Sequence, residues 1–342
     1  MCVPVILAFK RSFPQWGITV VTKGPFAPIF SRIPGVGVLP ADTKGRHKGL
    51  AGLRRLGREV RDLQPACIAD LHNVLRTRIL SAFLSGSGIP VRTIDKGRAE
   101  KKALTSSRHG RWAPLKSTHQ RYAGVFRELG FDIAIAENDR LQQESWPQEL
   151  LADRAPAGWH RIGIAPFAAH AGKCYPESLM TEVIDRLSQM GSCKMYLFGG
   201  GKAETEKLSV WAEKYPHCVS VAGKASLSEE LALISNLDLM VSMDSGNGHL
   251  AAMYGIPVVT LWGVTHPYAG FAPIGQPESY WLLADREKYP RIPTSVYGNK
   301  LPPGYEKAME TIAPERVCEL IAKILARPDE SQAITTGERD LK

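Results

Sequence analysis

The sequence contains no long hydrophobic run. No apolar stretch reaches the roughly 18 residues that a transmembrane helix needs. The apolar opening, residues 1–9, is short and is followed by Lys10 and Arg11, whereas a secretory signal peptide carries its charge first. Six scattered cysteines form no CxxC pair, which is typical of free thiols in a reducing compartment. We therefore expect a cytoplasmic protein.

Several signatures of catalysis and cofactor binding are also absent. No His, Cys or acidic cluster has the spacing of metal ligands, and there is no GxSxG elbow. The glycine run 199–201 does not fit GxGxxG. It is not a P-loop either, because Ala203 stands where Ser or Thr would bind magnesium. We expect neither a metal nor a bound cofactor.

Acidic residues are scarce in the first part of the chain. Residues 1–125 hold 22 Lys and Arg against 6 Asp and Glu, a net charge of +16, whereas the remainder holds 21 against 28, a net charge of −7. A basic segment favours an anionic partner, although a basic surface that faces only solvent would have the same charge composition. Aromatic residues for base stacking are nearly absent there, with only Trp112 close to the basic cluster. This disfavours nucleic acid and favours a phosphorylated or carboxylated partner.

The length, composition and pattern of the sequence predict an α/β protein of two domains. At 342 residues, 44% hydrophobic and 23% charged, the chain is long enough for two cores. We place an amino-terminal domain at 1–150, a carboxyl-terminal domain at 159–327 and a frayed tail at 328–342. Short β-rich runs alternate with helical patterns, which indicates mainly parallel sheets. The expected strands are 18–21, 67–70, 91–94, 161–165, 194–198, 218–221, 237–243 and 257–262.

The strongest local motif lies within residues 237–262. A buried strand ends in Asp244-Ser245-Gly246-Asn247-Gly248, and we expect a short helix to start at His249. Glycines such as Gly246 and Gly248 let a backbone approach a ligand, and a helix start offers free N–H groups to an anion. The motif predicts a diphosphate site to which Ser245 and His249 contribute. A helix cap with a core histidine is the alternative.

Two further loops follow predicted strands. Lys173 lies in the loop 166–176 and can reach a phosphate as a point charge, although this motif taken alone favours a solvated lysine. Glu204 follows the glycine run and either caps the next helix or binds a ribose diol.

Two groups of polar and basic residues follow strands in the basic first part of the chain. The helix after one strand opens with His72, Asn73 and Arg76. The cluster after the next strand contains Lys96, Arg98, Lys101 and Lys102, and we expect both groups to bind the acceptor.

The order and spacing of these motifs resemble glycosyltransferase family 9, the ADP-heptose:lipopolysaccharide heptosyltransferases. The resemblance is strong over 160–275 and loose before it. The matching segments are Gly172-Lys173 with Tyr175-Pro176, Phe198 to Gly201 with Glu204, Ala222 to Leu227, Asp244-Ser245-Gly246 with His249, and Gly255 to Pro267. The resemblance implies a GT-B fold, in which two Rossmann-like domains face a cleft. The nucleotide sugar would bind to the second domain and the acceptor to the first.

The resemblance also implies the chemistry of the site. It implies inverting transfer without a metal, from a nucleotide sugar such as ADP-heptose onto a lipopolysaccharide core or a related acidic glycolipid. Lys173 would contact the donor phosphates and Glu204 the ribose. Ser245, Gly246 and His249 would bind the diphosphate, Asp244 would fix the loop, and Lys224 would lie at the nucleobase pocket. Such an enzyme would make peripheral contact with the anionic cytoplasmic face of the inner membrane.

The sequence departs from the family at two places. Family members open with a strand and a Gly-Asp loop that carries the proposed catalytic base, whereas this sequence starts at the helix that follows, residues 1–9. We therefore expect that strand and that base upstream of Met1, and the catalytic residue stays unknown. Asn247-Gly248 replaces the usual Pro-Met, which leaves the donor sugar open. A non-catalytic nucleotide-sugar or glycan-binding protein and a nucleotide-sugar epimerase of the same fold are the alternatives.

Overall fold

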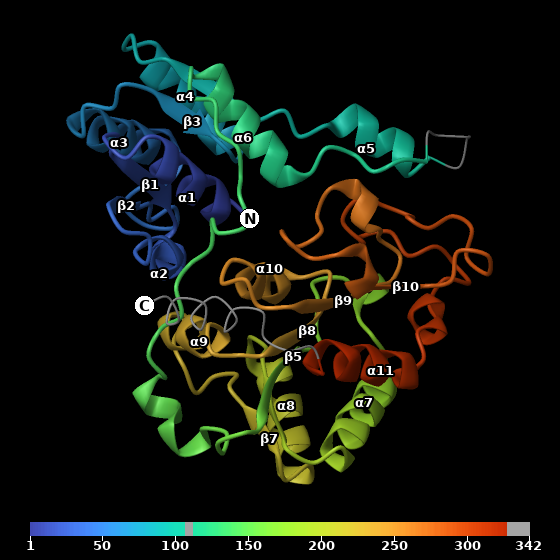
Figure 1. The fold of residues 1–342 in the computed structure, drawn as a ribbon. Helices are drawn as coiled ribbons and strands as arrows, with labels where there is room; N and C mark the ends of the chain where they lie inside the picture. Colours follow the sequence, from blue (N-terminus) through green and yellow to red (C-terminus); the bar gives the residue numbers. More distant parts are fainter. Residues whose placement is uncertain (107–111, 327–342) are drawn as a thin grey trace, which may run out of the picture.

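The carboxyl-terminal half of the protein is built on a six-stranded parallel sheet. The computed structural model describes residues 1–106 and 112–326. The strands are β5 (His160–Ala165), β6 (Cys193–Leu197), β7 (Cys218–Ser220), β8 (Leu239–Met243), β9 (Val258–Trp262) and β10 (Trp281–Leu283). Their order is β10-β9-β8-β5-β6-β7 (Figure 1). This is the doubly wound order, and the strand order reverses between β5 and β8, where such sheets bind their ligands.

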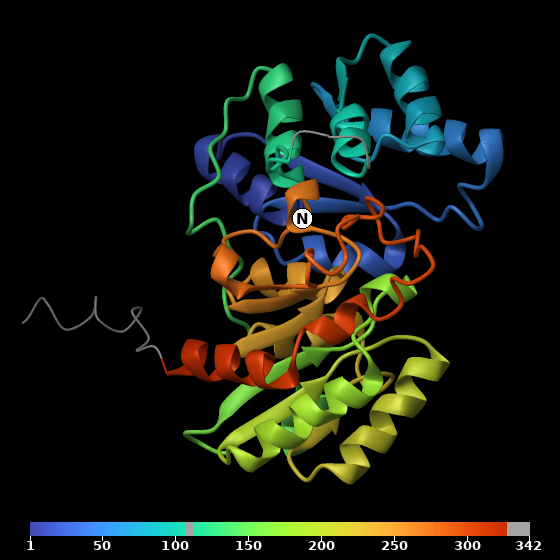
Figure 2. The ribbon, with the colours of Figure 1, turned by 90° about the vertical axis from the view of Figure 1, so that its right-hand side faces the viewer.

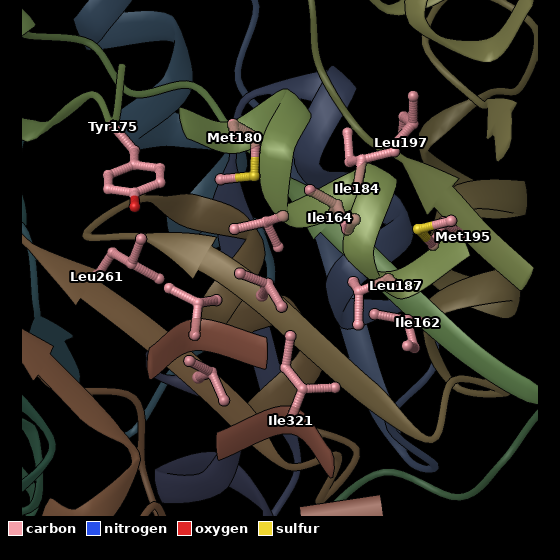
Figure 3. Packing of buried hydrophobic residues seen from close by; sticks show 14 of the residues in the cluster. Ile162, Ile164, Tyr175, Met180, Ile184, Leu187, Met195, Leu197, Leu261 and Ile321 are labelled. Carbon is pink, nitrogen blue, oxygen red and sulfur yellow. The ribbon is translucent and has the colours of Figure 1, made fainter. Parts of the chain in front are cut away.

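Helices cover both faces of this sheet. One face carries α7 (Glu177–Gln189), α8 (Lys202–Lys214) and α11 (Pro314–Leu325), and the other carries α9 (Leu227–Ile234) and α10 (Gly246–Ala252). Because the central strand β5 is buried on both sides, it is apolar throughout its second half. Figure 3 shows Ile162 and Ile164 of β5 among side chains of α7 and Ile321 of α11.

The amino-terminal half contains two separate two-stranded parallel sheets. One pairs β1 (Ile18–Thr22) with β2 (Val36–Pro40), and the other pairs β3 (Ile68–Asp70) with β4 (Val91–Thr93). The helices around them are α1 (Val3–Ser12), α2 (Ala27–Phe30), α3 (Gly49–Asp62), α4 (Leu75–Ser85), α5 (Arg98–Leu104) and α6 (Thr118–Glu128). Within residues 1–106 and 112–326, short 3-10 turns lie at Gly24–Phe26, Gln148–Asp153, Ala171–Lys173, Pro267–Ala269, Glu278–Tyr280 and Ala308–Thr311.

The two halves pack directly against each other. Val3 and Ile6 of α1 share a buried cluster with Ala251 and Met253 at α10. The Thr118 hydroxyl at the start of α6 donates a 2.9 Å hydrogen bond to the carbonyl oxygen of Gly270. Figures 1 and 2 both place the amino terminus between the halves, beside α10 in Figure 1. The first residues of the chain therefore lie close to the carboxyl edge of the six-stranded sheet.

The predicted α/β fold is confirmed, with all observed sheets parallel. The domain limits 1–150 and 159–327 stay predictions, and the tail 328–342 lies outside the described residues. No helix of residues 1–106 and 112–326 has the length and apolar character needed to cross a bilayer.

Candidate functional site

The loops after β5 and β8 meet where the strand order reverses. The Lys173 Nζ lies 2.9 Å from the Asp244 Oδ2, and the two side chains are only 14% and 10% exposed. The hydroxyl of Thr265, which follows β9, donates a 2.9 Å hydrogen bond to the same carboxylate oxygen. A buried charge needs such a partner. Two residues that the sequence singled out separately are therefore one ion pair at the ligand edge of the sheet.

Two glycines fix the backbone around Lys173. The carbonyl oxygen of Gly172 accepts a 2.9 Å hydrogen bond from the N–H of Val264. Gly298 has a φ of +77°, and a Cβ there would overlap the Lys173 side-chain stem. Because Gly298 has no side chain, a distant loop closes over the lysine. The ammonium group is thus held in place rather than free in solvent.

The helix that follows Asp244 starts earlier than the sequence predicts. The prediction of a start at His249 is wrong, since α10 begins at Gly246 with Ser245 at its N-cap and places His249 in the first turn. The Ser245 hydroxyl lies 3.1 Å from the hydroxyl of Ser242. A Cβ on Gly246 would meet open space, whereas one on Gly248 would lie 3.3 Å from the Ser242 hydroxyl. Gly248 therefore serves close packing against β8, and Gly246 leaves the helix start open.

His249 lies where the two halves meet. Burial lowers its pKa well below the ordinary value, and the charges of the Met1 amino group, His119 and Lys173 lower that pKa further. Its Nδ1 is buried and finds no hydrogen-bond partner among the described residues. The imidazole is thus neutral at physiological pH and has one ring nitrogen left for a ligand.

Glu204 and Lys224 lie on the neighbouring loops. The N–H of Gly200 donates a 2.8 Å hydrogen bond to the Glu204 Oε2, so the carboxylate closes its own glycine loop at the start of α8. This is the capping role that the sequence left open beside ribose binding, and the second role stays a prediction. Lys224 is exposed in the turn after β7. Its predicted place at a nucleobase pocket also stays a prediction.

Asp70 organises the loop after β3. Its Oδ1 accepts 2.9 Å hydrogen bonds from the N–H groups of His72 and Asn73, and its Oδ2 accepts one of 2.9 Å from the Thr77 hydroxyl. Asn73 has a φ of +46°, and its amide donates a 2.9 Å hydrogen bond to the Ile94 carbonyl oxygen. The predicted acceptor residues at this loop are therefore held by a buried carboxylate.

A group of cations gathers beside this loop. Burial lowers the pKa of His72, and the charges of Lys96, Arg76 and Lys23 lower it further, which places these groups around the imidazole. Arg98 lies close enough to Lys96 to lower the pKa of that ammonium group. Lys23 follows β1 and was not predicted, because nothing in its local sequence distinguishes it from other surface lysines.

Lys101 differs from its predicted neighbours in the basic cluster. It is 5% exposed, and its ammonium lies 4.0 Å from the ring centroid of Phe271 in the other half. Burial and the charge of Arg121 lower its pKa to about 8. Arg121 in turn donates a 2.6 Å hydrogen bond to Glu100. Lys101 thus joins the halves, while Arg98 and Lys102 are exposed.

Sequence reasoning missed several residues of this site. Thr265 was within a quoted motif but was given no role, and Gly298 lies in a segment without a recognisable pattern. His119 and Arg121 of α6 are both buried, and only the fold brings them to the boundary between the halves. Over the described ranges 1–106 and 112–326, no three His, Cys, Asp or Glu side chains form a group that could hold a metal ion.

Comparisons with known proteins agree on one family. A family model described as glycosyltransferase family 9 (heptosyltransferase) matches residues 53–296. The chain is 26% identical to lipopolysaccharide heptosyltransferase 2 of Salmonella typhimurium strain LT2 over 339 residues, covering 93% of this chain and 92% of the relative. It is 28% identical to lipooligosaccharide heptosyltransferase 2 of Haemophilus influenzae, covering 93% of each.

Solved structures show the same fold. A glycosyltransferase family 9 structure from Veillonella parvula superposes with a TM-score of 0.71 at 19% identity, covering 95% of this chain and 92% of that one. E. coli ADP-heptose lipopolysaccharide heptosyltransferase II superposes with a TM-score of 0.65 at 19% identity, covering 94% and 93%. These likenesses confirm the predicted GT-B architecture.

Proposed function

The chain belongs to glycosyltransferase family 9, and on that premise we propose that it transfers heptose from ADP-heptose to a lipopolysaccharide core or a related acidic glycolipid. The observation that carries the proposal is the buried pair of Lys173 and Asp244 at the reversal of strand order. A nucleotide bound at this edge would bring its diphosphate to the lysine. The relatives named above, which are lipopolysaccharide and lipooligosaccharide heptosyltransferases, support the choice of sugar and acceptor.

The donor half of the proposal rests on three groups from the loop after β5 and the start of α10. Lys173 supplies a positive charge, Ser245 a hydroxyl donor and neutral His249 a ring N–H. When the bond between the sugar and the diphosphate breaks, negative charge grows on the departing oxygen. Donors that are already in place stabilise that charge without reorganisation. In this proposal these side chains do the work that a divalent metal does in other transferases.

The acceptor half rests on the cations around His72. Lys23, Arg76, Lys96 and Arg98 form a positive surface that suits a phosphorylated or carboxylated glycolipid. In the proposed reaction a carboxylate base takes the proton of an acceptor hydroxyl, and the hydroxyl oxygen attacks the anomeric carbon on the face opposite the diphosphate. The carbon–oxygen bond to the diphosphate breaks, the nucleoside diphosphate leaves with the electron pair, and the configuration inverts.

The first test measures donor binding and transfer in Lys173→Met, with Lys173→Arg as the charge-preserving control. Losing a hydrogen bond to a charged group costs about 1.5–3 kcal/mol. We therefore expect Lys173→Met to weaken ADP binding by roughly tenfold or more, since each 1.4 kcal/mol is tenfold. Lys173→Arg should retain more affinity. Unchanged ADP affinity in Lys173→Met would contradict the assignment of Lys173 to the donor diphosphate site.

Controls in the same assay separate the alternatives. Conversion of the nucleotide sugar without any acceptor would identify an epimerase, and tight binding without transfer to any glycolipid would identify a binding protein. Addition of EDTA should leave transfer unchanged if the three side chains suffice. Activity that disappears with EDTA and returns with magnesium or manganese would refute metal independence.

A further inference from the structure

A loop of the carboxyl-terminal half, residues 294–300, is fixed beside the candidate donor lysine. Its two ends are tied together, because the Thr294 hydroxyl donates a 2.6 Å hydrogen bond to the carbonyl oxygen of Lys300. The N–H of Thr294 donates a 2.9 Å hydrogen bond to the chain just after β9, which anchors the loop to the sheet. A Cβ on Gly298 would overlap the Lys173 side chain, so this part of the loop rests on the lysine stem.

Tyr297 forms an exposed aromatic tip on this loop. Its side chain is 54% exposed, and its hydroxyl makes no hydrogen bond within the described ranges 1–106 and 112–326. The ring lies beside that of Phe271, with the ring centroids 5.8 Å apart. Phe271 in turn contacts the ammonium group of Lys101, which belongs to α5 in the other half. Tyr297 therefore lies at the boundary between the two halves.

Tyr297 also lies between the two sets of cations that the proposed reaction uses. Its neighbour Gly298 touches Lys173 on the donor side. Its ring partner Phe271 touches Lys101 of the basic cluster on the other side. Figure 1 shows α5 directly above the segments that follow β9. An acceptor that has its hydroxyl group at the donor site and its anionic group at the basic cluster would lie over this ring.

An exposed tyrosine ring in this position suits one face of a sugar. The face of an aromatic ring carries partial negative charge, and C–H bonds such as those on the apolar face of a pyranose are attracted to it. The tyrosine hydroxyl can donate or accept a further hydrogen bond at the ring edge. Because the Phe271 ring is already in contact with Lys101, Tyr297 is the member of this pair that is open to a ligand.

We propose that Tyr297 binds the accepting sugar by stacking against its apolar face, so that the second half of the protein contributes to the acceptor site as well as to the donor site. This inference rests on the proposed transfer reaction and deepens it. It assigns to the ring a pyranose unit whose carboxylate or phosphate group points toward the basic cluster.

The test compares Tyr297→Ala with Tyr297→Phe, with ADP-heptose as donor and lipopolysaccharide from a heptose-deficient strain as acceptor. We expect Tyr297→Ala to raise the KM for the acceptor by about tenfold, which corresponds to about 1.4 kcal/mol of ring contact. Tyr297→Phe keeps the ring and should stay close to the original KM. ADP affinity, measured by titration calorimetry, should be the same in all three proteins.

Two controls separate stacking from other roles of the loop. The loss in Tyr297→Ala should be equal at low and high salt, because the ring carries no charge, whereas attraction by the basic cluster is screened. Trp16→Ala removes another exposed ring, which precedes β1 and packs against Phe131. It should leave the KM for the acceptor unchanged.

Several outcomes would overturn the proposal. These are an unchanged acceptor KM in Tyr297→Ala, an equal loss in Tyr297→Phe, or a fall in ADP affinity that matches the loss for the acceptor. If the original protein transfers no sugar, the proposed reaction is wrong, and stacking is tested alone by saturation-transfer NMR with the deacylated oligosaccharide of the same lipopolysaccharide. Its C–H signals must then respond to the original protein and to Tyr297→Phe but not to Tyr297→Ala. An oligosaccharide that binds none of the three proteins would overturn the stacking proposal as well.

Discussion

His249 is the residue at which the two halves, the amino terminus and the candidate donor site meet. Its buried Nδ1 is without a partner among the described residues, and its neutral state follows from burial and from the nearby positive charges of the Met1 amino group and Lys173. We expect His249→Ala to weaken ADP binding by roughly tenfold, because an unmade hydrogen bond to a charged ligand costs about 1.5–3 kcal/mol. Isothermal titration with ADP checks this. His217→Ala, in the same half but paired with the ring of Trp159, is the control and should bind normally.

Two other histidines make stability depend on pH. Burial lowers the pKa of His119 to about 3 and that of His266 to about 4, and both residues are 4% exposed. An unfolded histidine titrates near 6.5, so between pH 6.5 and 4 the unfolded chain binds protons that the folded protein does not. Stability is therefore fully present above pH 6.5 and falls as the pH falls. Each histidine should contribute a loss of about 2 kcal/mol between pH 7 and pH 5.

Glu230 has the opposite effect on the pH dependence of stability over part of this pH range. Burial raises its pKa to about 7, so the folded state binds the proton more tightly than the unfolded one between pH 4.5 and 7. Between pH 7 and pH 5, urea unfolding should show a larger loss of stability in Glu230→Gln than in the original protein. In the double variant His119→Gln/His266→Gln the loss should turn into a gain, because Glu230 then acts without the two histidines. A pH dependence that is the same in all three proteins would contradict the assignment.

At the scale of elements, strong periodicity was the reliable signal. The strands β5, β6, β8 and β9 lie within about two residues of their predicted limits. The elements β2, α2, α5 and β10 were not predicted, although the equally short β3, β4 and β7 were. In β2, Gly37 and Pro40 interrupt the apolar pattern of a strand. Lys173 and Asp244 were both predicted, but their contact was not, because only the parallel pairing of β5 with β8 brings the two loops together.

The start of α5 shows how one backbone position holds an element. Gly97 has a φ of +61°, and a Cβ there would overlap the guanidinium of Arg121, which is buried and paired with Glu100. Gly97→Ala should therefore destabilise the protein by a backbone cost of about 1–2 kcal/mol and by an overpacking cost of about 1–3 kcal/mol.

Gly88→Ala is the matched control for this prediction. Gly88 has a φ of +85° with nothing near its missing Cβ, so only the backbone cost applies. The difference between the two variants in denaturant midpoint measures the clash with Arg121. Equal midpoints would mean that Arg121 moves away freely and does not hold α5 in place.

At the scale of the whole molecule, charge divides the protein into two parts with different expected partners. Residues 1–125 carry a net +16 and the remainder a net −7, so an anionic surface would attract the first part and repel the second. Of the basic cluster, Arg98 and Lys102 are exposed and Lys96 is half-buried, whereas Lys101 is buried against Phe271. Membrane or acceptor attraction should therefore depend on Lys96, Arg98 and Lys102, while Lys101 serves the contact between the halves.

Replacing Lys96, Arg98 and Lys102 together with Gln should weaken binding to phosphatidylserine or phosphatidylglycerol vesicles and flatten its dependence on salt. Each basic residue near an anionic surface contributes about 1 kcal/mol, so the triple variant should lose roughly a hundredfold in vesicle affinity. The triple variant of Lys202, Lys214 and Lys300, which lie exposed in the other half, is the control and should bind vesicles almost normally. ADP affinity should stay the same in both. A loss of ADP affinity equal to the loss of vesicle affinity would refute the separation of donor and acceptor surfaces, because the two charge clusters would then act on one ligand.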